Sequence, residues 1–231
     1  MSFELYRRVP VENLYILPIL LLSVILHEVA HGWMALRLGD PTARDAGRLT
    51  FNPLPHIDPV GSIIVPALIM FSGASFFLAW AKPVPVDPSN FRHPRRDDIL
   101  VSAIGPVSNI VLAFVCAVIF GGTLNLLSPD ADNTVTAASF FSGVFLNMLY
   151  VGIPMNIGLA VFNMIPIPPL DGSHVLASLL PQKFADAYRR VGMAGIFVLI
   201  LLLRWEPVRV GFMDLRATLM IPFDFLIRVL S

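Results

Sequence analysis

Residues 14–36 read LYILPILLLSVILHEVAHGWMAL, and this stretch decides the fold class. Apart from one tyrosine, its only ionisable residues are His27, Glu28 and His31. A helix needs about 20 mainly apolar residues to cross the hydrocarbon core of a bilayer. The run is long enough for that, so we expect a first transmembrane helix over residues 14–38.

Three further apolar runs indicate a polytopic membrane protein. Residues 99–128 and 133–170 contain no charged residue, and residues 191–203 form a shorter apolar run. The chain of 231 residues is 56% hydrophobic and 14% charged, whereas soluble domains are about 25% charged. We predict an all-α polytopic membrane protein, a transmembrane helix bundle with a small re-entrant or β-hairpin element. The formal net charge of zero offers no field for nucleic acid, which we exclude as a partner.

The residues from His27 to His31 have the pattern H-E-x-x-H. On a helix, residues four apart lie on one face, about 6 Å apart along the axis. Two imidazoles at this spacing can bind one Zn²⁺. Glu28 lies beside the first of them, where it can take a proton from zinc-bound water without coordinating the metal. Ionisable groups inside an apolar helix are costly and usually functional, which favours a metal site over two histidines satisfied by neighbouring groups.

A catalytic zinc site normally has three protein ligands, and Asp171 is the best candidate for the third. It follows the uncharged run 133–170, and a lone carboxylate there needs a cation as its partner. A zinc ion held by His27 and His31 would supply that cation. The alternative is a turn at the membrane surface, because Asp-Gly is a common turn dipeptide.

Two motifs together resemble the site-2 protease family of intramembrane zinc metalloproteases. One is H-E-x-x-H inside an apolar helix, and the other is NMIPIPPLDG at residues 163–172, of the form N-x-x-P-x-P-x-L-D-G. The resemblance covers most of residues 14–182. Further stretches that resemble the family are GDPTA at 39–43, NPLPHIDP at 52–59, KPVPV at 82–86 and GPVSN at 105–109.

The resemblance implies a function and a role for each site residue. His27, His31 and Asp171 would ligate one Zn²⁺. Glu28 would act as general base and acid, and Asn163 would hydrogen-bond the carbonyl oxygen as it gains negative charge. The implied activity is that of an HExxH zinc metalloendopeptidase that cleaves transmembrane segments of membrane proteins in regulated intramembrane proteolysis, with zinc-bound water as the nucleophile. The alternatives are a membrane zinc transporter and a protein that binds membrane segments without cutting them.

We expect the compact form of the family, without a PDZ domain or a cystathionine-synthase-type (CBS) domain. Residues 1–231 would then form one membrane-embedded metalloprotease domain, with a core at 14–182 and C-terminal helices at 183–231. Its expected partners are a transmembrane protein substrate and the lipid bilayer.

Two clusters of basic residues flank the apolar segment 60–81. The positive-inside rule places both clusters in the cytoplasm. A single crossing by this segment would separate them, so we favour a re-entrant hairpin, which leaves Asp171 at the depth of His31. The expected location is the prokaryotic inner membrane, with the active site toward the cytoplasm. The clusters are Arg37, Arg44 and Arg48 before the segment, and Lys82, Arg92, Arg95 and Arg96 around and after its end.

Residues 82–86 predict a short strand with prolines at alternate positions. Prolines at alternate positions remove N–H donors from one edge of such a strand. The amide groups on the other edge stay free to pair with an extended substrate. An ordinary proline-rich loop is the alternative.

Predictions also follow for four polar residues outside the two motifs. Asn109 is expected either to hydrogen-bond across the bundle or to face the site. His56 and Asp58 are expected to belong to loop structure, and the alternative is that they approach the active site. His174 is expected to support the site or an interface rather than to be a fourth ligand.

Overall fold

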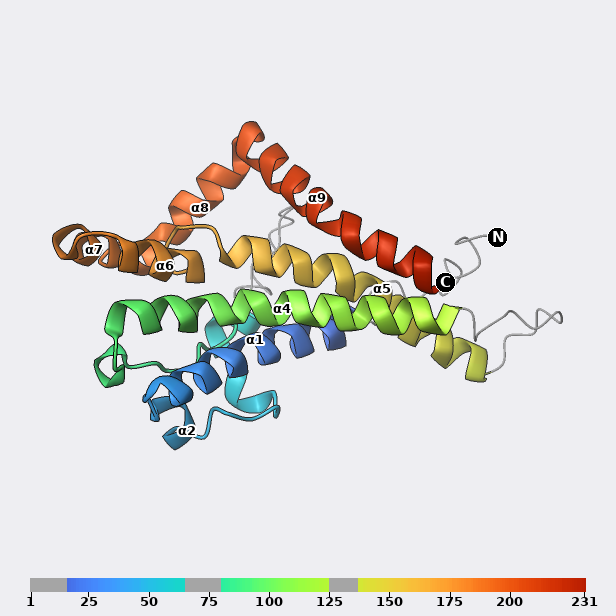
Figure 1. Cartoon of the computed structure of the whole chain (residues 1–231), viewed down its shortest axis with the longest axis horizontal. Coiled ribbons are helices and arrows are strands. Elements are labelled where there is room, and N and C mark those ends of the chain that lie inside the picture. The colour runs from blue at the N-terminus through green and yellow to red at the C-terminus, as the bar shows by residue number, and fades with distance from the viewer. Residues whose placement is uncertain (1–15, 65–79, 125–136) are drawn as a thin grey trace.

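Three long helices form the body of the protein in this computed structural model, which describes residues 16–64, 80–124 and 137–231. These are α1 (Ile16–Leu38), α4 (Pro94–Leu124) and α5 (Ala137–Asn163), and they run side by side (Figure 1). Each contains a stretch long and apolar enough to cross a membrane. Within the described ranges there is no β-strand. The prediction of an all-α transmembrane bundle is confirmed.

Short elements connect and extend the long helices. Between α1 and α4 lie α2 (Thr42–Asp45), the 3-10 turns η2 (Leu54–His56) and η4 (Pro88–Asn90), and the π-helical turn η3 (Pro59–Ile64). After α5 the chain forms α6 (Asp171–Leu179), α7 (Gln182–Arg189), the 3-10 turn η5 (Gly192–Ala194), α8 (Gly195–Arg204) and α9 (Glu206–Leu230).

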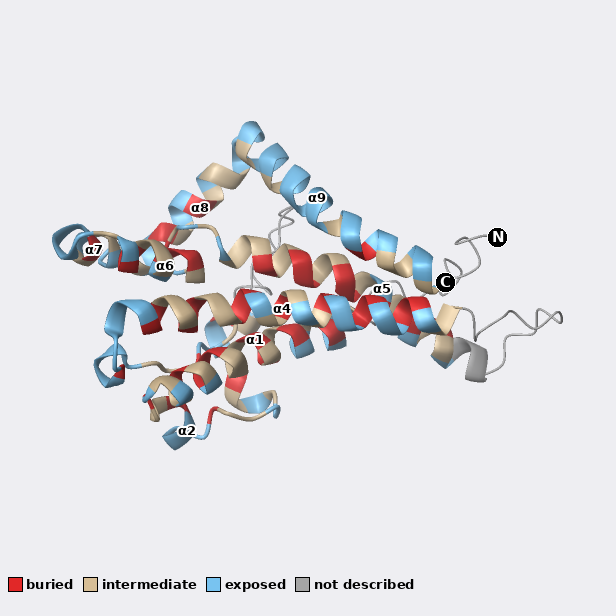
Figure 2. Cartoon of the chain, viewed as in Figure 1, coloured by how far each residue is buried: buried red, intermediate tan, exposed pale blue. Residues whose placement is uncertain are grey.

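Helix α4 is the centre of the bundle and packs against α1, α5, α6 and α9. Its buried positions include Ala113, Ala117 and Gly121, and small residues at a spacing of four let helices approach closely. Buried residues lie on the inner faces of the three long helices, and exposed residues lie on their outward faces (Figure 2). The exposed side chains include Leu17 and Phe114. Because a spanning helix faces lipid rather than water, this arrangement suits the bilayer.

The C-terminal helices α8 and α9 meet at an angle and form a V that stands beside α5 (Figure 1). Residues Gly192–Arg204 are apolar but shorter than a span, as expected, and α9 carries several charged residues. Phe223 of α9 is buried in the main core, so the second half of α9 is part of the bundle.

The described residues on the two sides of the apolar segment 65–79 are in contact with each other. Trp80 N–H donates to Gly61 O over 3.2 Å, and Ser62 Oγ donates to Trp80 O over 2.8 Å. One crossing of a hydrocarbon core about 30 Å thick would keep these ends apart. Their contact supports the re-entrant arrangement; the hairpin itself falls mainly on residues 65–79, outside the described residues.

The strand expected at residues 82–86 does not form. The segment has no regular secondary structure, and the amide groups of Lys82 and Val84 are bonded to partners outside it. Lys82 N–H donates to His56 O over 2.9 Å, and Val84 N–H donates to Glu28 Oε2 over 2.7 Å. The expected free edge is therefore wrong for these two residues, because a side-chain carboxylate and a loop carbonyl already use their donors.

Candidate metal centre

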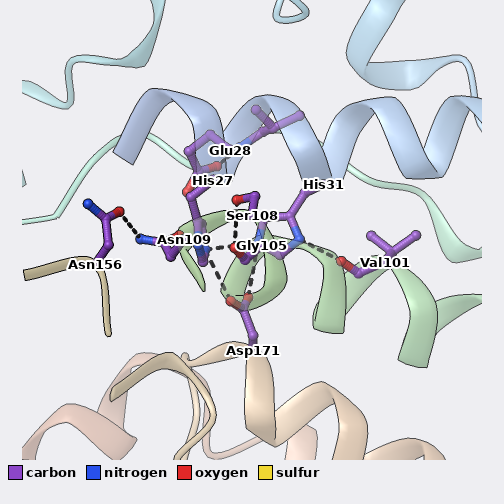
Figure 3. Close-up of polar contacts among 10 residues, drawn as sticks. His27, Glu28, His31, Val101, Gly105, Ser108, Asn109, Asn156 and Asp171 are labelled. Carbon is purple, nitrogen blue, oxygen red and sulfur yellow. Dashed lines mark hydrogen bonds and ion pairs between the residues drawn. The ribbon is translucent and has the colours of Figure 1, made fainter. Parts of the chain in front are cut away.

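The middle of α1 presents two histidines to α4. His27 and His31 lie one helical turn apart, both are buried, and their Nε2 atoms are 3.0 Å apart (Figure 3). The spacing of four residues places both imidazoles on one face, as predicted. Buried histidines on a membrane-spanning helix need polar partners, and the partners come from α4 and α6.

Asp171 reaches the histidines from the first residue of α6. Its Oδ2 lies 3.1 Å from His27 Nε2 and its Oδ1 lies 3.4 Å from His31 Nε2. The proline-rich turn between α5 and α6 brings it there, with Leu170 N–H donating to Ile167 O over 3.0 Å. Gly172 is required in this turn, because an added Cβ would lie 2.8 Å from Ile165 O. The motif thus folds the chain back so that its carboxylate faces both imidazoles (Figure 3).

The remaining ring nitrogens determine where the hydrogens are. His31 Nδ1 lies 2.6 Å from Val101 O, and a carbonyl oxygen can only accept, so His31 donates its Nδ1–H. His27 Nδ1 lies 2.8 Å from Asn109 Oδ1 and donates in the same way. In the neutral imidazoles both Nε2 lone pairs therefore point toward the Asp171 carboxylate.

A cation fits where these three acceptors converge. Asp171 Oδ2 is buried and has no hydrogen-bond partner among the residues that the structure describes. The separations of 3.0, 3.1 and 3.4 Å are close to the roughly 3.3 Å between neighbouring ligands of a tetrahedral zinc with bonds of about 2.0–2.1 Å.

Because Gly105 of α4 has no side chain, the two imidazoles can occupy the space beside it. A Cβ at this position would collide with His31 Nε2 and would lie 2.7 Å from His27 Cε1. Only a residue without a side chain lets α4 pass this close to the histidine face of α1 (Figure 3). The convergent acceptors and this glycine together form a cradle of the size that a single metal ion needs.

A cavity of about 990 Å³ opens beside the three groups. Glu28, Val84 and Asn163 line it, and apolar residues of α8 close part of it. Glu28 is held by the amide of Val84. Asn163, at the end of α5, is half-buried and shares this cavity with Asp171. The structure thus brings all five predicted site residues to one cavity.

The other polar candidates lie outside the group of three acceptors. His174 lines the cavity, half exposed, with Nδ1 3.7 Å from Asp98 Oδ1. His56 Nε2 lies 2.9 Å from Thr50 O, and Asp58 accepts from the N–H groups of η3. These last two residues belong to loop structure, as expected. Among the residues described, His27, His31 and Asp171 are the group that could hold a metal ion.

Two features near the site were not predicted. Asn156 of α5 is fully buried and bonded to Asn109; an asparagine in an apolar span was the available signal. Asp98, also buried, accepts from Ser178 Oγ over 2.7 Å and from Arg189 Nη2 over 3.0 Å. These contacts join α4 to α6 and α7, and so hold the helix that carries Asp171.

Comparison with known proteins identifies the family of this chain. Residues 128–203 match Peptidase family M50. YwhC of Bacillus subtilis, named as a zinc metalloprotease, is 36% identical over 188 residues, which cover 81% of this chain and 79% of YwhC. The chain belongs to peptidase family M50. Rip2 of Mycolicibacterium smegmatis, also named as a zinc metalloprotease, is 31% identical over 196 residues, covering 84% of this M50 chain and 68% of Rip2. No solved structure matches it significantly.

Membership of family M50 confirms the resemblance to site-2 proteases. Together with the three apolar helices, it makes this M50 protein an integral membrane protein of a metalloprotease family. Zinc as its metal is implied by the names of the relatives. The roles of individual residues stay predictions.

Proposed function

We propose that this M50 protein is a zinc endopeptidase that hydrolyses peptide bonds of transmembrane segments within the bilayer. One observation carries the proposal: three acceptors, from His27, His31 and Asp171, converge inside a membrane bundle beside a cavity. These residues would hold one Zn²⁺. A buried convergence of lone pairs is unfavourable unless a cation occupies it, so it is an arrangement built for a metal.

When bound, zinc supplies Lewis acidity that makes water a nucleophile near neutral pH. Glu28 would act as the general base for the attacking water and then as the general acid for the leaving amine. The Val84 amide holds Glu28 Oε2, which fixes the carboxylate and leaves its second oxygen for this task. The Asn163 amide would donate to the carbonyl oxygen as it becomes negative, an interaction typically worth about 2.7–4 kcal/mol.

The substrate in this proposal is an apolar membrane segment. A second, apolar groove of about 870 Å³ lies between the α4–α5 pair and the α8–α9 pair. It shares Leu199 and Leu203 with the cavity of the site, so a segment lying there would be close to the acceptors. The substrate helix must unwind locally, because its own hydrogen bonds conceal the peptide bond.

The site would face the cytoplasm. Both basic clusters lie in or next to segments at one end of the bundle. This is the end that holds α2 and the start of α4 (Figure 1). The positive-inside rule assigns that end to the cytoplasm. In this orientation α6 and Asp171 approach the histidines from the cytoplasmic half of a prokaryotic inner membrane.

The proposal is tested by cleavage of a panel of transmembrane-helix substrates in detergent. We expect the wild type to cleave at least one substrate, to stop on chelation and to recover with Zn²⁺. Glu28→Gln should keep its zinc and lose cleavage, because the amide cannot accept the proton. Zinc flux into liposomes without cleavage would favour a transporter instead, and substrate binding without cleavage would favour a non-cleaving binder.

A further inference from the structure

A chain of buried amides leads from α5 to His27. Asn156 Nδ2 donates to Gly152 O over 2.8 Å, and Asn109 Nδ2 donates to Asn156 Oδ1 over 3.2 Å. Asn109 Oδ1 in turn lies 2.8 Å from His27 Nδ1 (Figure 3). Both asparagines are buried, at 1% and 0% exposure, so water does not compete for these groups.

The direction of every hydrogen bond in this chain follows from its first member. Gly152 O is a backbone carbonyl and can only accept, so Asn156 must turn its amide nitrogen toward it. Asn156 then presents Oδ1 to Asn109. Asn109 must donate to this oxygen from Nδ2, so its own Oδ1 faces His27. That oxygen accepts the Nδ1–H, and the lone pair of His27 is left on Nε2.

We infer that Asn109 and Asn156 are positioning residues that fix His27 in the tautomer able to bind a metal. The inference rests on the proposed function, since it concerns the affinity of the same three acceptors for a metal ion. If Asn109 were reversed, its NH₂ group would face His27 Nδ1 and the ring hydrogen would move to Nε2. His27 could then no longer serve as a ligand until that proton was lost.

The two histidines differ in how their tautomers are set. His31 is fixed by the backbone carbonyl of Val101, which no substitution removes. His27 depends on a side chain, and that side chain depends on a second one in α5. Partners that hold the far nitrogen of a ligating histidine typically change metal affinity by 10–100-fold. A purely structural role, in which the asparagines only join α4 to α5, would change stability instead.

The experiment measures Zn²⁺ affinity of the detergent-purified full chain by chelator competition at one pH, and the Co²⁺ absorption spectrum. The variants are Asn109→Leu, Asn156→Leu and Asn109→Asp. The matched control is Asn147→Leu, because Asn147 lies on α5 and, within the described part of the chain, its amide donates to Gly143 O of its own helix. The melting temperature of each metal-free variant is measured alongside.

We expect Asn109→Leu to bind Zn²⁺ about 10–100-fold more weakly and to show an altered Co²⁺ spectrum. Asn156→Leu should also weaken binding, because Asn109 is then free to reverse. Asn109→Asp should not weaken Zn²⁺ binding, because both carboxylate oxygens can only accept and one still faces His27 Nδ1, even though the hydrogen bond to Asn156 Oδ1 is lost. The control should keep wild-type affinity. If Asn109→Leu fails to fold, the comparison of Asn156→Leu with the control decides.

Wild-type zinc affinity in both leucine variants, with only a lower melting temperature, would overturn the inference and leave the proposed function standing. A wild type that binds neither Zn²⁺ nor Co²⁺ would overturn the proposed function and, with it, the inference.

Discussion

Replacing Gly105 by alanine tests whether the space beside the histidines is required. The added Cβ would lie 2.6 Å from His31 Cε1 and 2.7 Å from His27 Cε1, whereas ordinary contacts begin at 3.4 Å. Each ring would therefore have to move by at least about 0.7 Å, taken from these distances. Hydrogen bonds to Val101 and Asn109 oppose such a movement.

The expected cost of Gly105→Ala follows from these distances. Misplacing catalytic groups by about 1 Å can reduce turnover about 100-fold, and overpacking a core costs about 1–3 kcal/mol. We expect losses of this size in cleavage rate and unfolding free energy, with weaker zinc binding. Gly122→Ala is the matched control, because Gly122 lies on the same helix and its added Cβ would meet no atom of the described residues within 4 Å. Wild-type cleavage and zinc affinity in Gly105→Ala would refute this account of the cradle.

Three further predictions concern other parts of the site and fold. Asn163→Ala should lower kcat by about 10²–10³ without changing zinc content; an unchanged kcat would remove Asn163 from the oxyanion role. Asp98→Ala should cost about 1–3 kcal/mol in thermal unfolding, since Ser178 and Arg189 lose their acceptor, and an unchanged melting temperature would show that α6 is held otherwise. Burial acts to raise the pKa of Asp40, but bonds from Thr42 and the residues around 87–90 outweigh it and lower that pKa. Its stabilisation should therefore be present above the unfolded value of about 3.9 and be lost as pH falls through the lower folded value. The gap in melting temperature between wild type and Asp40→Asn should accordingly shrink below about pH 4, and a gap that widens there would contradict the assignment.

The three candidate metal ligands could be predicted from the sequence because the reasons for choosing them depend on neighbouring residues in the chain. The spacing of His27 and His31 fixes a shared helix face wherever the helix packs. Asp171 stands alone after a long uncharged run, so its need for a cation is visible without knowing the fold. The structure brings these three residues together, as that reasoning requires.

The supporting groups could not be predicted, because they depend on how helices are placed relative to one another. Nothing in the sequence pairs Asn156 with Asn109 until the register of α5 against α4 is known. The use of the Val84 amide by Glu28 likewise depends on tertiary position, and it replaced the free strand edge that the proline pattern had predicted. Asp98 joins three helices through partners far along the chain.

The most direct test of the central claim is the coordination of zinc in the purified protein, measured by metal content and X-ray absorption. We predict one zinc per chain with two imidazole nitrogens at about 2.0–2.1 Å and a carboxylate oxygen at about 2.0–2.2 Å. In Asp171→Ala the carboxylate contribution should disappear and the zinc affinity should fall. Zinc bound in that variant with unchanged affinity and coordination would contradict the account.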